Sequence, residues 1–372
     1  MDVRVLVVSL AWAVGLAGLF AGVVRLLRRR EPPGIGAVTL ALLITCGVAF
    51  PALVVVTRVA RLDVFGVASL VWWTIIVGIP LAGILVLAQH PRRAVAWIAW
   101  GAVVVPLVLS WWGMRIEPSK LEVVETAVAV PNERAGVSPV RVGVISDIQF
   151  RQVGDHEREA VERLSAEHPD VIVVAGDIYQ GPQDGFEAQL PAIRSLLGGL
   201  QAPGGVYLVG GDVDQPETRL AQVVEGTDVR WLHNEIVDVP VGDRTVRIGG
   251  VELSYASPAA KATIEELRTA PGDEVRLLVA HRPDVVLGLP LDDRIDLTIA
   301  GHTHGGQISV PGIGPLATAS GVPRAMAAGG LHEHQGNQIF VTTGVGMERS
   351  QAPPVRLGVP PTIGVLTLSS GP

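Results

Sequence analysis

Four long apolar runs occupy the first third of the chain, at residues 3–24, 35–57, 66–89 and 94–114. Each has about the length of a helix that spans a bilayer, roughly 20 residues. Asp, Glu, Lys and Arg occur only at the edges of these runs. We interpret the runs as an anchor, because a transport or proton path normally needs ionisable side chains inside the membrane. The first run is long, lacks a basic start and precedes three more, so we expect an uncleaved helix rather than a secretory signal.

The balance of charge changes at about residue 120. Ten Lys and Arg stand against four Asp and Glu before residue 120, and nineteen against thirty-two from there on. Seven of the eight tryptophans also precede residue 120, as expected for side chains at membrane interfaces. We therefore expect four transmembrane helices over 1–115, a linker over 116–139 and a second domain over 140–372. The acidic second part has no stripe of Lys and Arg, which argues against a nucleic-acid partner.

Basic residues in the short loops favour one orientation in the membrane. The loops on the other side contain five of them. The loops after the first and third runs contain six: Arg25, Arg28, Arg29, Arg30, Arg92 and Arg93. The positive-inside rule places this denser group in the cytoplasm. We therefore expect an integral protein of the cell membrane whose second domain lies outside the cytoplasm.

Short Val- and Ile-rich segments alternate with helical patterns after residue 140. Segments such as 140–147, 171–177, 275–281 and 296–304 have the continuous apolar pattern of strands buried on both faces. Amphipathic stretches at 156–170, 186–200 and 261–270 separate some of them, whereas 245–253 and 338–345 lack intervening helices. This arrangement predicts an α/β layered domain with mixed sheets.

Each of five predicted strands ends at a polar residue that can bind a metal. These residues are Asp147, Asp177, Asp212, His281 and the pair His302 and His304. The carboxyl ends of strands are where α/β sheets build their sites. Ionised carboxylates are costly there unless they are paired or bound to a metal. Three aspartates and three histidines suffice for two divalent ions, and this donor set suits Zn, Mn or Fe. Two such ions can activate water and clamp a phosphoryl oxygen.

The order of these residues resembles the calcineurin-like metallophosphoesterases, whose motifs are D-x-H, G-D, G-N-H-[DE], H and G-H-x-H. The segments that carry the resemblance are AGD at 175–177, VAHRPD at 279–284 and AGHTHGGQ at 300–307. The last is typical of a membrane-associated branch of the family. The resemblance implies an αββα sandwich. It also implies one metal on Asp147, Asp177 and His304, and another on Asp177, Asp212, His281 and His302, bridged by Asp177.

Three positions depart from the family pattern. Gln149 replaces the first histidine, and its carbonyl oxygen would be a weaker ligand for a transition metal. Asp212 replaces the asparagine and adds a negative charge. Together these changes favour oxygen-preferring ions, Mn²⁺ slightly over Fe or Zn. Val213 replaces the histidine that the family uses near the scissile phosphate. Either the leaving group is good or stabilised by a metal, or another residue supplies the general acid, or the site is catalytically poor.

The leading hypothesis is a membrane-anchored phosphoesterase that uses two divalent ions and acts on a phosphomonoester, phosphodiester or pyrophosphate. Tethering at a bilayer makes an envelope or lipid-linked substrate plausible. The predicted ligands are Asp147, Gln149, Asp177, Asp212, His281, His302 and His304. Catalytic candidates are Asp177, Asp214 and His302, and Arg282 is a candidate for substrate binding. His332 and His334 are weaker candidates for the function that Val213 lacks, and Tyr179 could line the pocket. The alternative is a catalytically weakened sensor module that binds metal or phosphate without cleaving it.

Overall fold

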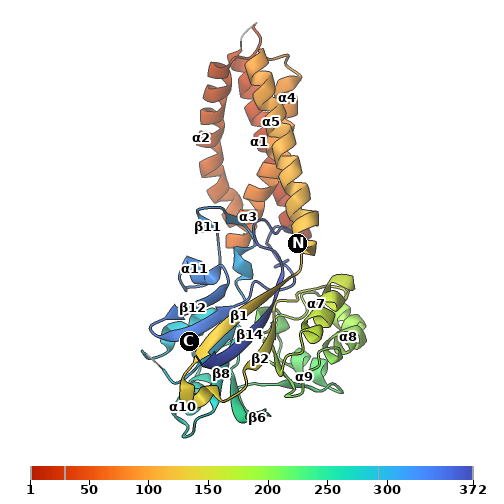
Figure 1. Cartoon of the computed structure of the whole chain (residues 1–372). Helices are drawn as coiled ribbons and strands as arrows, with labels where there is room; N and C mark the ends of the chain where they lie inside the picture. Colours follow the sequence, from red (N-terminus) through yellow and green to blue (C-terminus); the bar gives the residue numbers. More distant parts are fainter. Residues whose placement is uncertain (1, 29–30, 292, 371–372) are drawn as a thin grey trace. The chain divides into compact units, whose positions relative to one another are not determined.

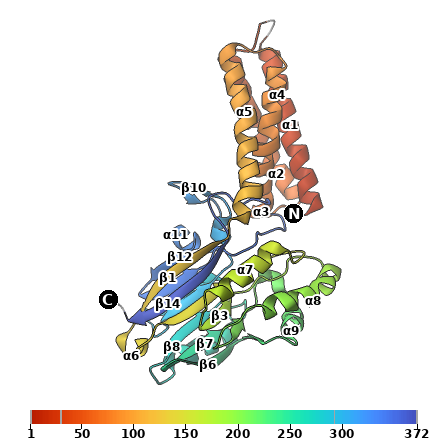
Figure 2. The same cartoon turned by 45° about the vertical axis from the view of Figure 1, so that its right-hand side comes forward.

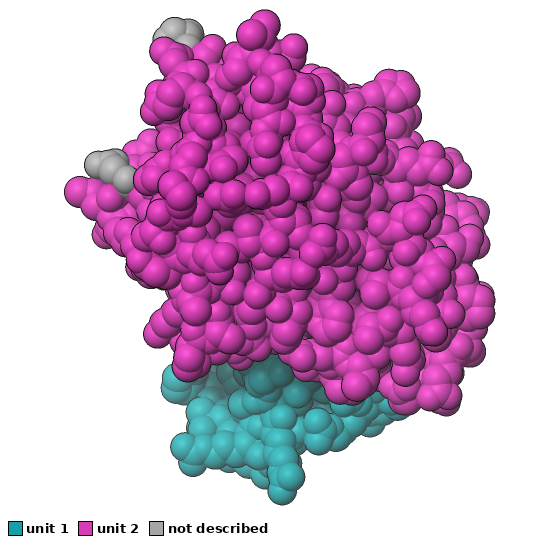
Figure 3. All heavy atoms as spheres, turned by 90° about the horizontal axis from the view of Figure 1, so that it is seen from below, with its two compact units in different colours: residues 1–116, 348–355 teal, residues 117–347, 356–372 magenta. Residues whose placement is uncertain are grey.

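The structure is a computed structural model that describes residues 2–28, 31–291 and 293–370. The chain divides into two compact units, coloured separately in Figure 3. The first comprises Met1–Ile116 and Glu348–Val355, and the second Glu117–Met347 and Arg356–Pro372.

Four helical spans of the chain are long and apolar enough to cross a membrane: Val3–Leu27, Ile35–Val59, Val64–Leu87 and Arg93–Ser119. The first two are α1 (Val3–Leu27) and α2 (Ile35–Val59). The third consists of α3 (Val64–Trp73), a π turn η1 (Thr74–Gly78) and α4 (Ile79–Leu87). The fourth begins with α5 (Arg93–Trp111), followed by η2 (Trp112–Ile116) and η3 (Glu117–Ser119). Figures 1 and 2 show α1, α2, α4 and α5 side by side.

Glycines let α4 and the π turn approach the neighbouring helices closely. A Cβ atom at Gly78 would lie 3.1 Å from the carbonyl oxygen of Ala13, and one at Gly83 would lie 2.8 Å from that of Ala99. Small residues at such positions are usual between membrane helices, because lipid provides no hydrophobic driving force and close packing replaces it.

A short segment near the end of the chain belongs to this helical unit. The backbone N–H of Asp2 donates to the carbonyl oxygen of Ser350 at 2.9 Å. The hydroxyl of Ser69 donates to the carbonyl oxygen of Gln351 at 2.6 Å. These bonds attach Glu348–Val355 to the first unit.

The second unit contains two six-stranded sheets. One has the order β1-β14-β2-β3-β4-β5 and the other β12-β13-β9-β8-β7-β6. The strands of the first sheet are β1 (Glu122–Val130), β14 (Thr362–Ser370), β2 (Val140–Ile145), β3 (Val171–Val174), β4 (Val206–Leu208) and β5 (Val229–Trp231). Those of the second are β12 (Gly330–His334), β13 (Asn337–Val341), β9 (Leu297–Ala300), β8 (Val275–Val279), β7 (Arg244–Gly250) and β6 (Glu235–Val241). A small hairpin pairs β10 (Ser309–Val310) with β11 (Gly314–Pro315).

The two sheets pack face to face and carry helices on their outer faces. Val144 and Val173 of the first sheet share one buried cluster with Ile248 and Leu277 of the second. The outer face of the first sheet packs against α7 (Asp155–Ala166), α8 (Gln183–Gly198) and α9 (Thr218–Val224). The outer face of the second packs against α10 (Pro258–Thr269), η5 (Pro283–Gly288) and α11 (Arg324–Ala327). This layering confirms the predicted αββα sandwich preceded by four long apolar helices.

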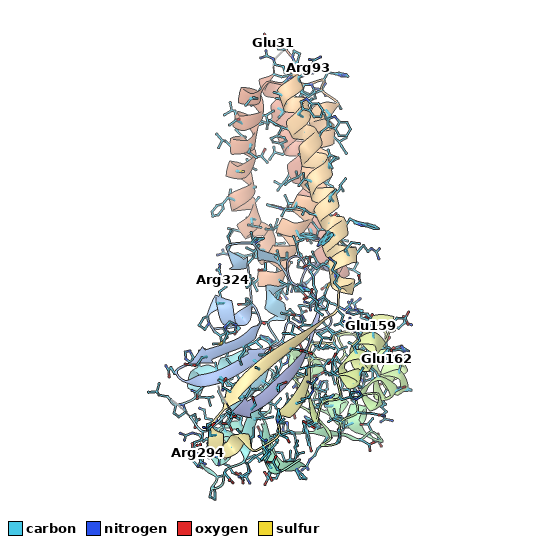
Figure 4. All side chains as sticks on the ribbon, viewed as in Figure 1. Glu31, Arg93, Glu159, Glu162, Arg294 and Arg324 are labelled. Carbon is cyan, nitrogen blue, oxygen red and sulfur yellow. The ribbon has the colours of Figure 1, made fainter. Side chains whose placement is uncertain are left out.

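The helices of this unit are amphipathic, as their sequences predict. In α7, Ala160 and Leu164 are fully buried. Glu159 and Glu162 of the same helix are exposed and extend away from the sheet (Figure 4). The apolar stripe therefore holds the helix on the sheet and the charged face meets solvent.

Two segments differ from the sequence-based expectations. Residues 116–139, expected to be a linker, contain β1 and α6 (Asn132–Ala135), and β1 pairs in parallel with β14 along its whole length. This pairing joins segments more than 200 residues apart, which a local pattern does not reveal. His332 and His334, expected in a loop, lie in β12, where His332 pairs with Ile339 of β13.

Candidate metal centre

The polar residues predicted to form the site follow the carboxyl ends of strands in both sheets. Strands β2, β3 and β4 are parallel neighbours, so Asp147, Asp177 and Asp212 leave the first sheet at one edge. Strands β8 and β9 are also parallel neighbours, and His281 and His302 follow them. Because the sheets are stacked, the two edges bring carboxylates and imidazoles together.

At these strand ends, two groups of side chains lie close enough to hold a metal ion. One is Asp147, Asp177 and His281, and the other is Asp212, His281 and His302. In each group the potential ligand atoms lie within 4.8 Å of one another. The ring centroids of His281 and His302 are 5.2 Å apart. His281 therefore stands between the two groups.

His281 shows how well these residues fit a cation. Its Nδ1 atom lies 2.7 Å from the carbonyl oxygen of Ala175, which fixes the ring and leaves Nε2 available as a ligand atom. Nε2 is buried and has no hydrogen-bond partner among the described residues, although carboxylate oxygens of Asp177 and Asp212 each lie 3.4 Å from it. Burial opposes protonation, yet these carboxylates raise the pKa of His281 well above its usual value. An acidic, buried pocket around a lone imidazole nitrogen suits a divalent cation.

Asp147 and Asp177 are held by short hydrogen bonds. The hydroxyl of Ser146 donates to Asp147 at 2.6 Å, and the backbone N–H of His302 lies 3.1 Å from both of its oxygens. Burial, reinforced by the charge of Asp177, raises the pKa of Asp147 to about 6. The backbone N–H of Val213 donates to Asp177 at 2.9 Å. Both carboxylates thus have fixed orientations before any ion binds.

Gln149 lies beside Asp177, where the family pattern has histidine. Its side-chain nitrogen donates to Oδ2 of Asp177 at 2.7 Å, and the residue is fully buried. The amide therefore touches the predicted bridging carboxylate directly.

Asp212 contacts both histidines and an arginine. Its Oδ2 atom lies 2.9 Å from Nδ1 of His302 and 3.4 Å from Nε2 of His281. Arg282 donates from Nε to Oδ2 at 3.2 Å and from Nη2 to Oδ1. Burial alone would raise the pKa of Asp212, but these donors hold it well below its usual value. Arg282, predicted to bind substrate, is thus paired with Asp212.

Asp214, predicted as a catalytic candidate, is part of neither metal-binding group. Its oxygens accept hydrogen bonds from the backbone N–H groups of Asp177 (2.8 Å), Ile178 (2.9 Å) and Gly211 (2.9 Å). Burial and the neighbouring Asp177 raise its pKa to about 6. This geometry favours a positioning role, because the carboxylate faces three amides of the two loops that carry Asp177 and Asp212.

The backbone at the site is strained. Positive φ angles, between 41° and 73°, occur at five residues of the site: Asp147, Gln149, Asp177, His302 and His304. Non-glycine residues in this region cost about 1–3 kcal/mol each and cluster at functional sites. Glycine is required close by, since a Cβ at Gly301 would collide with Ser146 Oγ and with Asp147 Oδ2.

His304 and Arg356 form a second buried contact at the edge of the site. His304 belongs to neither of the two metal-binding groups, and its Nε2 lies 3.4 Å from Asp147. Arg356 is fully buried, and its Nη2 lies 3.5 Å from Nδ1 of His304. Sequence reasoning missed Arg356; the available signal was a single arginine in the apolar, Pro-rich stretch 351–361.

The weaker candidates lie in structural positions. Tyr179 packs between the rings of Phe150 and Phe186, at centroid distances of 6.0 and 5.6 Å. Nε2 of His332 lies 3.0 Å from the carbonyl oxygen of Gly329. Neither residue is part of a metal-binding group among the described residues.

Comparison with known proteins agrees with this geometry. Residues 140–306 match the family model described as calcineurin-like phosphoesterase. Over these residues the chain is similar to this family of metal-dependent hydrolases, which generally use a dinuclear divalent metal centre, and the match supports the family predicted from the sequence.

Relatives of the chain include three bacterial proteins. The uncharacterised metallophosphoesterase YkuE of Bacillus subtilis is 26% identical over 68% of this chain and 88% of its own length. The phosphodiesterase YaeI of Escherichia coli is 24% identical over 62% of this chain and 83% of its own. The UDP-2,3-diacylglucosamine pyrophosphatase LpxG of Chlamydia muridarum is 22% identical over 56% of this chain and 77% of its own.

Proposed function

We propose that this protein is a membrane-anchored phosphoesterase that uses two divalent ions to hydrolyse a phosphoester or pyrophosphate bond. The observation that carries the proposal is the position of His281, whose Nε2 lies 3.4 Å from both Asp177 and Asp212. Both metal-binding groups contain this imidazole, so two ions held by them would lie side by side. Two metals about 3.5–4 Å apart are typical of phosphatases.

We assign the ligands by position. One ion would be held by Asp147, Asp177 and Gln149, with His304 at the edge. Asp212, His281 and His302 would hold the other, with Asp177 shared. When bound, the ions would supply water activation and positive charge against the phosphoryl oxygens. The chain itself contributes fixed ligand orientation, through Ser146, Val213 and Ala175.

The metal is proposed to be Mn²⁺ in preference to Fe or Zn. The potential donors include three carboxylates and the amide of Gln149, and such oxygen-rich sets favour harder ions. Metal analysis of protein purified without chelator should find manganese. Zinc as the sole metal would contradict this choice.

The substrate is proposed to be an envelope or lipid-linked phosphoester. Four spans that could cross a membrane support this idea, because they would keep the second unit, hereafter the phosphoesterase unit, at a bilayer surface. The chlamydial relative, a pyrophosphatase named for a diacylated sugar nucleotide, is consistent with a pyrophosphate bond. We further propose that the spans lie in the cell membrane with the phosphoesterase unit outside the cytoplasm.

The proposed activity is tested with full-length protein in detergent, Mn²⁺ and a generic aryl phosphodiester. The wild type should release the phenol, and Asp177→Asn should reduce the rate to that of buffer with Mn²⁺. Asp228→Asn, a change at an exposed residue of the same type, is the matched control and should keep the wild-type rate. Equal rates for wild type and Asp177→Asn would contradict the proposal.

A second candidate function is a sensor that binds metal or phosphate without turnover. Val213 favours it, because an aliphatic side chain stands where the family has a catalytic histidine. Binding of Mn²⁺ and inorganic phosphate by the wild type, with no hydrolysis of any phosphoester tested, would favour this candidate.

A further inference from the structure

We propose that Arg282 is a positioning residue that acts through Asp212, orienting this carboxylate so that its Oδ2 faces His281 and His302. The inference rests on the proposed metal site and adds a residue to it. It differs from the substrate contact predicted from the sequence, in which Arg282 would touch the phosphate directly.

The contacts of Asp212 show this orientation. Oδ2 points at the two histidines, 2.9 Å from His302 and 3.4 Å from His281. The guanidinium of Arg282 lies across both oxygens, with Nε 3.2 Å from Oδ2 and Nη2 on Oδ1. Planar, two-point pairing of this kind fixes the plane of a carboxylate as well as its charge.

Asp212 needs such a partner more than the other two aspartates do. Asp147 and Asp177 are almost completely buried and accept backbone hydrogen bonds from His302 and Val213. The side chain of Asp212 is 29% exposed, and no backbone N–H donates to it among the hydrogen bonds of the described residues. Arg282 therefore performs for Asp212 the orientation that main-chain amides perform for the other two.

The chain places Arg282 for this purpose. It directly follows His281, so one strand end supplies both an imidazole of the site and the guanidinium that orients its neighbour. The nearby carboxylate of Asp284 accepts from the hydroxyl of Ser320 and from the backbone N–H of Gly321, both at 2.6 Å. Asp284 is thus engaged elsewhere, and Arg282 pairs with Asp212.

Residues that orient metal ligands typically change metal affinity 10- to 100-fold when they are replaced. We therefore expect Arg282→Gln to weaken Mn²⁺ binding about tenfold or more. The same change should cause no further loss in a chain that already carries Asp212→Asn, because the carboxylate that Arg282 orients is then gone.

The experiment is a double-mutant cycle on full-length protein in detergent, stripped of metal. Free Mn²⁺ is followed by electron paramagnetic resonance during titration of the wild type, Arg282→Gln, Asp212→Asn and the double variant. Arg247→Gln is the matched control, because Arg247 pairs with Asp238 at 2.7 and 2.8 Å and touches neither metal-binding group. It should keep the affinity of the wild type.

Two results would overturn the inference. One is unchanged Mn²⁺ affinity in Arg282→Gln, which together with a raised KM would assign Arg282 to the substrate. The other is an equal loss of affinity with and without Asp212→Asn, which would show that Arg282 does not act through Asp212. Thermal unfolding of the stripped proteins checks the fold, and Arg282→Lys replaces the glutamine variant in the same cycle if that variant unfolds.

Hydrolysis of an aryl phosphodiester by the wild type is measured in parallel. Mn²⁺ binding without hydrolysis would contradict the proposed function and leave the cycle to decide the role of Arg282. Absence of Mn²⁺ binding by the wild type would contradict both.

Discussion

Nη2 of Arg356 lies 3.5 Å from Nδ1 of His304 at the edge of the site, and both side chains are buried. The same guanidinium donates to the carbonyl oxygens of Thr343 (2.8 Å), Gly344 (3.1 Å) and Gly346 (2.9 Å). Burial, reinforced by the charge of Arg356, keeps the pKa of His304 well below its usual value. Arg356 thus joins the loop after β13 to a neutral imidazole, the form that can bind a metal.

Arg356→Met should strongly destabilise the phosphoesterase unit. Burial lowers the pKa of Arg356 to about 10, so the group is charged at neutral pH and satisfies several buried carbonyls at once. Removing it leaves those oxygens without donors, a loss of about 3–5 kcal/mol. Thermal unfolding in detergent measures the effect. Arg158→Met, at an exposed arginine, should unfold like the wild type, and the same behaviour from Arg356→Met would refute the prediction.

Asp214→Asn should lower stability without changing the shape of the pH–rate profile. The new NH₂ group would face a backbone N–H that now donates to an oxygen, so we expect a loss of about 1.5–3 kcal/mol. Unfolding temperature and the pH dependence of kcat are the two measurements. A protein of wild-type stability that has lost one limb of its pH profile would instead make Asp214 a proton donor.

Val213→His should accelerate cleavage of substrates with poor leaving groups. The backbone N–H of residue 213 donates to Asp177 at 2.9 Å and is kept by the change, so the ligand stays in place. A positioned acid contributes about 10²–10⁴-fold, and a phenol leaving group needs it least. Rates are compared for an alkyl and a nitrophenyl phosphodiester, with Val213→Ala as control. An equal effect on both substrates would argue against a missing general acid.

The proposed orientation predicts labelling from outside the cell. Val137 is 92% exposed in the second unit, and Cys46 is the only native cysteine. In a Cys46→Ala background, Val137→Cys should react with an impermeant maleimide in intact cells. Glu31→Cys, in the loop between the first two spans, should react only after permeabilisation. The reverse pattern would place the phosphoesterase unit in the cytoplasm.

The sequence predicts where these polar side chains lie in the fold better than it predicts which residues they contact. Asp147, Asp177 and His281 could be found because each follows an apolar run, and runs of this kind form parallel strands whose ends meet. The four spans were also recognisable, since bilayer thickness fixes the length of their apolar runs. These features depend on short stretches of the chain.

What could not be predicted depends on contacts between distant segments. The strand at 122–130 is an edge strand with a mixed burial pattern, and it is defined by its pairing with β14. The pairing of Arg282 with Asp212 and the contact of Arg356 with His304 join side chains far apart in sequence. A single arginine carries no periodic signal, so its partners appear only in the folded chain.

The central claim is that Asp147, Asp177, Asp212, His281 and His302 gather two divalent ions. Anomalous diffraction at the manganese edge, from crystals of the full-length protein grown with Mn²⁺, tests it most directly. The account predicts two peaks about 3.5–4 Å apart, one against Asp147 and Asp177 and the other against Asp212, His281 and His302. Crystals saturated with Mn²⁺ that show no peak between these side chains would contradict it.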